Sequence, residues 1–191
     1  MESTAESAQI MAGNTIAQFD QILGSAREIF LNKMKDYGTA WRILRASSIT
    51  DQIYIKAQRI RSIEEKGIQK VNEGIDNEFL GIINYCIIAL IQAEFGADHE
   101  VESDKEDVTR HFDFHVAETK RLLENKNHDY GEAWRGMRIS SMTDLILMKL
   151  LRIKQIEDNK GQTMISEGVE ANYYDIINYS VFALIKMKEE E

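Results

Sequence analysis

Acidic and amide side chains recur on helix faces that the sequence predicts to be buried. On a helical wheel of residues 51–66, Glu64 falls on the apolar stripe, and Glu157 takes the same place in a second helix. Asp175 and Asn178 lie three residues apart in an otherwise apolar run. Oxygen ligands of this kind suit Mg²⁺. We therefore predict a magnesium site from Glu157, Asp175, Asn178 and, with weaker affinity, Glu64, in which Glu157 and Asp175 are catalytic.

A structural role for the same residues stays open. A carboxylate on a core face is costly unless it is paired, protonated or bound to a metal. A glutamate at a helix end can instead reach solvent or pair with an arginine. A buried Asp–Asn pair can form a polar network that fixes helix register.

Basic side chains flank these stripes one helical turn apart. They can hold phosphates, with arginine giving bidentate contacts, or they can pair with nearby acidic residues. The predicted phosphate-binding residues are Lys126, Arg135, Arg138, Lys149 and Arg152, with Lys33, Arg42, Arg45, Lys56 and Arg59 as a second set.

The two sets exist because the chain contains an internal repeat. Residues 32–66 and 125–159 are identical at 19 of 35 aligned positions, at an offset of 93 residues that becomes 94 after Gly161. A repeat this long is one structural unit used twice. Gly81 stands where the second copy has Asp175. We therefore expect the more complete ligand site in the second copy.

Composition favours long helices. The 191 residues include no proline and 11 glycines, and 43% are hydrophobic. Each copy predicts three longer helices and one short helix. We predict an all-α fold in which two tandem helical repeats pack as a pseudo-twofold bundle through their apolar closing helices, 77–94 and 172–188.

The predicted boundaries of the repeats and the linker follow from the pattern of charged and hydrophobic residues. We expect a disordered tail at 1–15, helical repeat 1 at 16–95, an acidic and mobile linker at 96–109 and helical repeat 2 at 110–188. Hydroxyl groups at 47–50 are expected to cap a helix that begins at Asp51.

Charge and cysteine content limit the function classes. The formal net charge of −9 argues against non-specific nucleic-acid binding. Residues 32–66 and 125–159 together carry +5 and the rest −14, which suits a small anionic ligand. Cys86 is the only cysteine, so we expect a reducing, cytoplasmic location. No apolar run reaches about 18 residues, so we expect no membrane contact.

Three short motifs carry a family resemblance. K-x-x-D-Y-G-x-A-W from Lys33, S-S-x-T-D from Ser47 and D-I-I-N-Y from Asp175 resemble the nucleotide modification associated domain 1 family, whose domain often occurs in tandem. The resemblance implies a link to nucleotide metabolism.

A more distant similarity is to the all-α nucleoside triphosphate pyrophosphatases of MazG and dimeric dUTPase type. In these, acidic residues on neighbouring helices hold Mg²⁺, often across a dimer. The similarity implies such roles for Glu157 and Asp175. Their E-E-x-x-E signature is missing here, and Gly81 removes the matching acid from the first copy.

Two functions therefore stay open. The first is a nucleotide-metabolism protein with Mg²⁺-dependent nucleoside triphosphate pyrophosphatase-like hydrolysis. The alternative is a non-catalytic helical module that binds a nucleotide or another protein. Either way we expect a small anionic ligand, a nucleotide, as partner, and homo-oligomerisation stays open.

Overall fold

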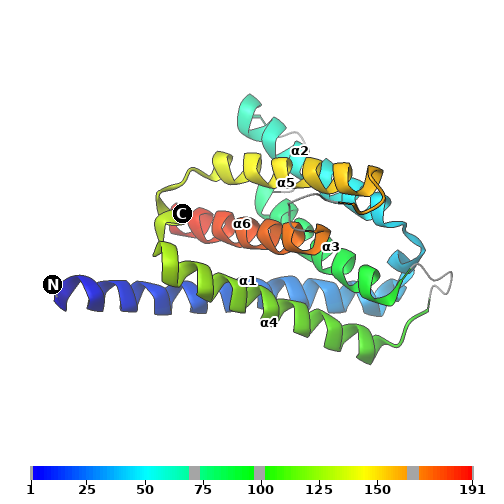
Figure 1. The fold of residues 1–191 in the computed structure, drawn as a ribbon, viewed down its shortest axis with the longest axis horizontal. Coiled ribbons are helices and arrows are strands. Elements are labelled where there is room, and N and C mark those ends of the chain that lie inside the picture. The colour runs from blue at the N-terminus through cyan, green and yellow to red at the C-terminus, as the bar shows by residue number, and fades with distance from the viewer. Residues whose placement is uncertain (1, 69–73, 97–101, 163–167, 191) are drawn as a thin grey trace.

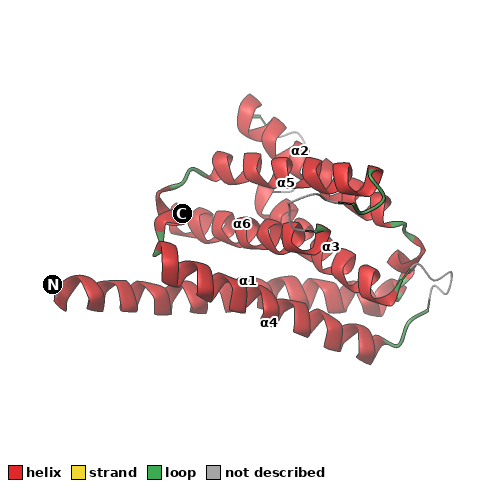
Figure 2. Ribbon diagram, viewed as in Figure 1, coloured by secondary structure: helices red, strands yellow, loops and turns green. Residues whose placement is uncertain are grey.

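Every regular element that the structure describes is a helix, as the composition predicts (Figures 1 and 2). The computed structural model describes residues 2–68, 74–96, 102–162 and 168–190, with side chains from residue 14 onward. Repeat 1 consists of α1 (Glu2–Tyr37), the short 3₁₀ helix η1 (Ala40–Ile43), α2 (Ala46–Lys66) and α3 (Ile75–Phe95). Repeat 2 consists of α4 (Lys105–Tyr130), η2 (Ala133–Gly136), α5 (Ile139–Asp158) and α6 (Val169–Glu190).

The helices form three layers, each made of one helix from each repeat. Figure 1 shows α1 beside α4 at the bottom, α3 with α6 in the middle, and α2 with α5 at the top. Side chains of the middle layer such as Ile82, Ile83, Ile176 and Ile177 have no exposed surface. The closing helices therefore form the shared core, and the predicted tandem bundle is confirmed.

The two repeats also attach their short helices in the same way. In repeat 1 the Gln92 side-chain amide donates to the backbone carbonyl of Arg42, at 3.1 Å. In repeat 2 the Lys186 ammonium donates to the backbone carbonyl of Arg135, at 2.8 Å. Gln92 and Lys186 occupy equivalent positions in the repeat, so the pseudo-twofold relation extends to the turns.

Glycine ends α1. Gly38 has a φ of +64°, and its amide donates to the carbonyl of Met34 at 3.0 Å. This left-handed conformation satisfies an end carbonyl and turns the chain into η1. Gly38 thereby brings η1 back over the end of α1.

Several helices begin earlier than predicted. α2 begins at Ala46 rather than Asp51, so Thr50 lies inside the helix, and its hydroxyl oxygen is 3.2 Å from the Ala46 carbonyl oxygen instead of capping the helix start. α4 begins at Lys105, capped by Asp104, whose side chain accepts from the amide of Glu106. An acidic side chain of the predicted linker is thus used as a cap, and residues 97–101 lie outside the described part.

α1 extends over the predicted tail. It runs from Glu2 without interruption, since no proline occurs to break it. Side chains before residue 14 lie outside the described part, and the domain limits stay a prediction.

Among the helices of the described part, α3 is the most apolar. By length and composition it could cross a membrane, with a mean hydropathy of 1.4, but 67% of that stretch is buried inside the protein. Burial between α2, α6 and α1 explains its composition as that of a core helix.

Candidate functional site

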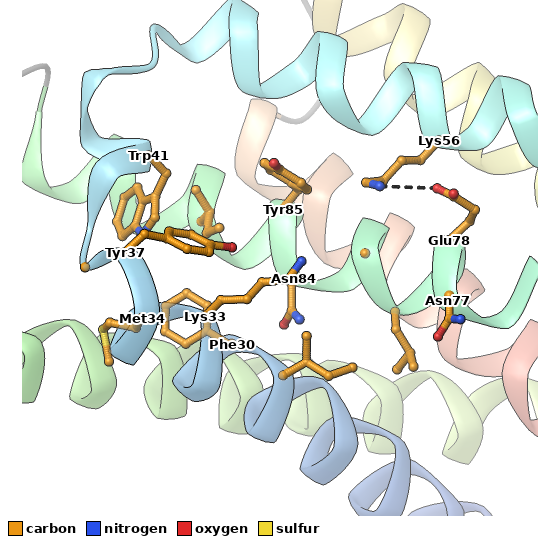
Figure 3. A pocket seen from close by; sticks show the side chains of 15 residues that line it. Phe30, Lys33, Met34, Tyr37, Trp41, Lys56, Asn77, Glu78, Asn84 and Tyr85 are labelled. Atoms are coloured by element: carbon orange, nitrogen blue, oxygen red, sulfur yellow. Dashed lines mark hydrogen bonds and ion pairs between the residues drawn. The ribbon is translucent and has the colours of Figure 1, made fainter. Parts of the chain in front are cut away.

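A cavity of about 350 Å³ lies in repeat 1 between the end of α1, η1, α2 and α3. Its walls include aromatic, amide and charged side chains, among them Phe30, Lys33, Tyr37, Trp41, Lys56 and Asn84 (Figure 3). Pockets for small molecules are of this kind, mostly apolar with a few polar groups, and this volume is at the small end of their usual range.

The pocket has two chemically different ends. Figure 3 shows Trp41 and Tyr37 at one end, and Lys56 with Glu78 at the other. Lys33, Asn84 and Tyr85 lie between them in this view. A planar ring and an anionic group would therefore find matching surroundings at opposite ends of the same pocket.

Gly81 provides the space at the charged end. A Cβ atom at this position would lie 3.1 Å from Cε and 3.3 Å from Nζ of Lys56. The missing side chain lets Lys56 lie directly over the backbone of α3. The Lys56 ammonium donates to Glu78 at 3.2 Å, and Arg59 binds the other oxygen of the same carboxylate.

Asn84 presents an unused acceptor to the pocket. Its Nδ2 donates to the Ala26 carbonyl at 3.0 Å, which fixes the amide against α1. Its Oδ1 is buried and has no hydrogen-bond partner among the described residues. Buried polar atoms normally have a partner, so this oxygen is suited to a donor on a ligand.

The equivalent space in repeat 2 is filled by the protein itself. Asp175, the counterpart of Gly81, accepts hydrogen bonds from Lys149 at 2.7 Å and from Lys126. The ring of Phe182, at the position of Ile88 in repeat 1, stacks on Trp134 with centroids 4.3 Å apart. The asymmetry expected at Gly81 is present, but the pocket lies in repeat 1 rather than in repeat 2.

The Asp175 carboxylate is held in its charged form. Burial alone would raise its pKa, but the hydrogen bonds from Lys126 and Lys149 outweigh burial, and the pKa lies below its usual value. Both lysines therefore pair with the same internal anion.

Glu64 and Glu157 connect the two repeats. Glu64 accepts a hydrogen bond from Thr143 at 2.9 Å, and Glu157 accepts one from Thr50 at 2.7 Å. Burial raises the pKa of both carboxyl groups. Asp175 instead binds Lys126 and Lys149, so the two predicted catalytic residues have different partners.

The predicted magnesium ligands consequently do not form one donor set. In the described part of the chain, no three His, Cys, Asp or Glu side chains are placed to share a metal ion. Both side-chain amide atoms of Asn178 are buried and without a partner among the described residues. These residues do not fit a Mg²⁺ site, because the glutamates bind threonines and Asp175 binds two lysines.

A family model described as nucleotide modification associated domain 1 matches residues 33–93 and 126–187. The chain belongs to this family. The two matches coincide with the two repeats and cover most of the chain, so the family resemblance of the motifs is confirmed. No curated protein and no solved structure matches the chain.

In this nucleotide modification associated domain 1 protein, two of the predicted phosphate-binding arginines bind groups within the helical bundle. Arg42 is buried, binds Gln92 and donates to the Gly96 carbonyl at 3.2 Å. Arg135 binds Glu132 and reaches Glu189 at 2.7 Å. These two of the predicted phosphate-binding arginines are thus occupied by internal acceptors.

The remaining predicted arginines lie outside the pocket of repeat 1, although Arg138 lines a separate, more open cavity with Glu64. Arg45 and Arg138 are exposed residues that precede α2 and α5. Arg152 donates weakly to Gln155, at 3.5 Å. Of the predicted phosphate-binding residues, only Lys33 and Lys56 line the pocket of repeat 1.

Glu78 is the pocket residue that the sequence pattern did not reveal. Its counterpart is Asn172, just as the counterpart of Gly81 is Asp175. The carboxylate has therefore moved by one helical turn between the repeats of this family member. This exchange is visible in the aligned repeats and could have indicated that the two sites differ in kind.

Proposed function

We propose that this protein binds a nucleotide in the pocket of repeat 1, and that binding rather than hydrolysis is its role. The observation that carries the proposal is the pocket itself. It joins an aromatic end, formed by Tyr37 and Trp41, to a cationic region with Lys33 and Lys56. The family description supplies the ligand class.

Aromatic side chains suit the base. A nucleobase stacks on an aromatic ring whatever its sequence identity, a contact worth about 1–3 kcal/mol per base in nucleic-acid complexes. The free Oδ1 of Asn84 can accept a hydrogen bond from a base or sugar donor. The positions of these groups favour a ligand with both a ring and polar substituents.

Hydrolysis of the pyrophosphatase type has less support. That chemistry needs carboxylates that converge on Mg²⁺. Glu157, Glu64 and Asp175 each bind a different internal partner among the described residues. A cytoplasmic location belongs to the same proposal, since the buried Cys86 is a free thiol.

The test is a thermal-shift screen of nucleosides and nucleotides, with and without Mg²⁺, followed by calorimetry. A ligand that binds the folded state raises the melting temperature. Tyr37→Ala should weaken binding by roughly tenfold, because stacking is lost. Tyr130→Ala is the matched control, since Tyr130 is the exposed counterpart of Tyr37 and lines none of the cavities described above.

Two outcomes would overturn the proposal. The first is a screen in which no nucleoside or nucleotide shifts the melting temperature. The second is Mg²⁺-dependent release of pyrophosphate by the unmodified protein, which would establish the hydrolase instead.

A further inference from the structure

Repeat 2 contains an anion where repeat 1 has an open space. Lys126 and Lys149 converge on the Asp175 carboxylate, which is largely buried, with 15% of its side chain exposed. Their counterparts in repeat 1 are Lys33 and Lys56, and both line the pocket above Gly81. The two repeats are built from equivalent helices. The site of repeat 2, which the Asp175 carboxylate occupies, therefore indicates where an anion fits in repeat 1.

The charges of the open site differ in one respect. In repeat 1 the carboxylate has moved to Glu78, where it binds Lys56 and Arg59. No carboxylate of the described residues pairs with Lys33, whereas its counterpart Lys126 is paired with Asp175. The position of Glu78 thus leaves Lys33 and the pocket beside Gly81 and Lys56 for a group from outside the protein.

We infer that the ligand of repeat 1 carries a single phosphate, which lies in the pocket beside Gly81 against Lys33 and Lys56, much as the Asp175 carboxylate lies against Lys126 and Lys149. The inference rests on the proposed function and specifies its ligand as a nucleoside monophosphate. The ring then lies toward Tyr37 and Trp41, at the other end of the pocket.

The size and charge of the site favour one phosphate over three. A cavity of about 350 Å³ is small for a ligand pocket. The Glu78 carboxylate at the charged end repels further phosphate groups, since like charges at short range disfavour each other. A triphosphate would also bring more negative charge than Lys33 and Lys56 neutralise.

The experiment is calorimetry of one nucleoside with its mono- and triphosphate, on the unmodified full chain and on two variants. Gly81→Asp reproduces the internal anion of repeat 2, and Gly81→Asn has nearly the same size without the charge. The three heavy atoms nearest to a Cβ atom added at Gly81 all belong to the flexible end of Lys56, so both variants should fold. Circular dichroism and the melting temperature check this.

We expect the monophosphate to bind at least about tenfold tighter than the nucleoside and tighter than the triphosphate. Gly81→Asp should weaken monophosphate binding by roughly tenfold more than Gly81→Asn does. The two variants should have similar affinities for the nucleoside. Lys33→Gln should lower the affinity for the monophosphate, and Lys35→Gln, on the same helix but outside the pocket lining, should not.

The outcomes separate the two proposals. Equal losses for Gly81→Asp and Gly81→Asn, or equal affinities of nucleoside and monophosphate, would overturn the phosphate position and leave nucleotide binding standing. Failure of all three ligands to bind the unmodified protein would overturn both.

Discussion

The hydroxyl of Thr50 in repeat 1 donates a hydrogen bond to the carboxylate of Glu157 in repeat 2, at 2.7 Å. Thr143 and Glu64 form the reciprocal bond at 2.9 Å. The threonine and the glutamate each recur in both repeats. Because of the pseudo-twofold relation, the threonine of each repeat binds the glutamate of the other, which gives two contacts between α2 and α5. For these two pairs, the recurrence of the same polar residues in both repeats reflects the interface between the repeats.

Thr143→Val should lower the free energy of unfolding by about 1–3 kcal/mol, because it leaves a half-buried carboxylate without its donor. Chemical denaturation measures the change. Ser140→Ala is the control, since Ser140 is exposed near the start of the same helix, and surface changes of this kind stay within about 0.5 kcal/mol. Equal effects of the two substitutions would show that the Thr143 bond adds nothing.

The double variant Glu64→Gln, Glu157→Gln should be at least as stable as the unmodified protein at pH 7. Burial raises the pKa of both carboxyl groups, so the folded state favours their protonated forms. Their contribution to stability is greatest at low pH and is lost as the pH rises from the unfolded pKa through the raised folded pKa. Glutamine resembles the protonated form at every pH and can still accept from threonine.

The advantage of the double variant should therefore shrink as the pH falls below the usual carboxyl range. Denaturation at a series of pH values between 3 and 8 would follow it. If the difference in free energy of unfolding between the double variant and the unmodified protein grew toward low pH, it would contradict the assigned direction of the two pKa shifts.

Asp175→Asn should destabilise the protein by about 1–3 kcal/mol at neutral pH, because Lys126 and Lys149 lose a charged acceptor. The pKa of Asp175 is depressed, so its contribution is present above the unfolded pKa and is lost as the pH falls through the folded pKa. Asp113→Asn is the control, because Asp113 pairs with Arg27 at the surface, where such pairs contribute about 0–1 kcal/mol. A loss no larger than that of the control would count against the internal-anion role.

Asn178→Leu should preserve or raise stability, because neither amide atom of Asn178 has a partner among the described residues. A buried unsatisfied polar group costs about 1–3 kcal/mol, and leucine removes it. Asn84→Leu makes the comparison, since it breaks the bond to Ala26 and should destabilise. A large loss for Asn178→Leu, seen in denaturant melts, would reveal a polar network that the structure does not contain.

The helical bundle was predicted well from the sequence, because the features that indicate it are local and occur in both repeats. The absence of proline, the Gly38 turn and the apolar closing helices each appear in both copies or follow from composition. Helix starts were less predictable, since Thr50 lies inside α2 and its hydroxyl donates to Glu157 of the other repeat instead of capping the helix. Residues 2–15 of α1 were assigned to a tail because their composition is small and polar.

The site was only partly predictable. Lys33 and Lys56 were among the predicted ligands and line the pocket, but their role depends on the absence of a side chain at Gly81. A helical wheel places Glu64 and Glu157 on a core face without revealing that each meets a threonine of the other repeat. Which carboxylate faces which cation is decided by packing between helices that are far apart in the chain.

The most direct test of the central claim is the stoichiometry of nucleoside monophosphate binding by calorimetry. One open pocket in repeat 1 and a space filled by Asp175 and Phe182 in repeat 2 predict one molecule bound per chain, with loss of binding on Gly81→Asp. Two molecules per chain, or a single site that survives Gly81→Asp and is lost on Asp175→Asn, would contradict the assignment of the site to repeat 1.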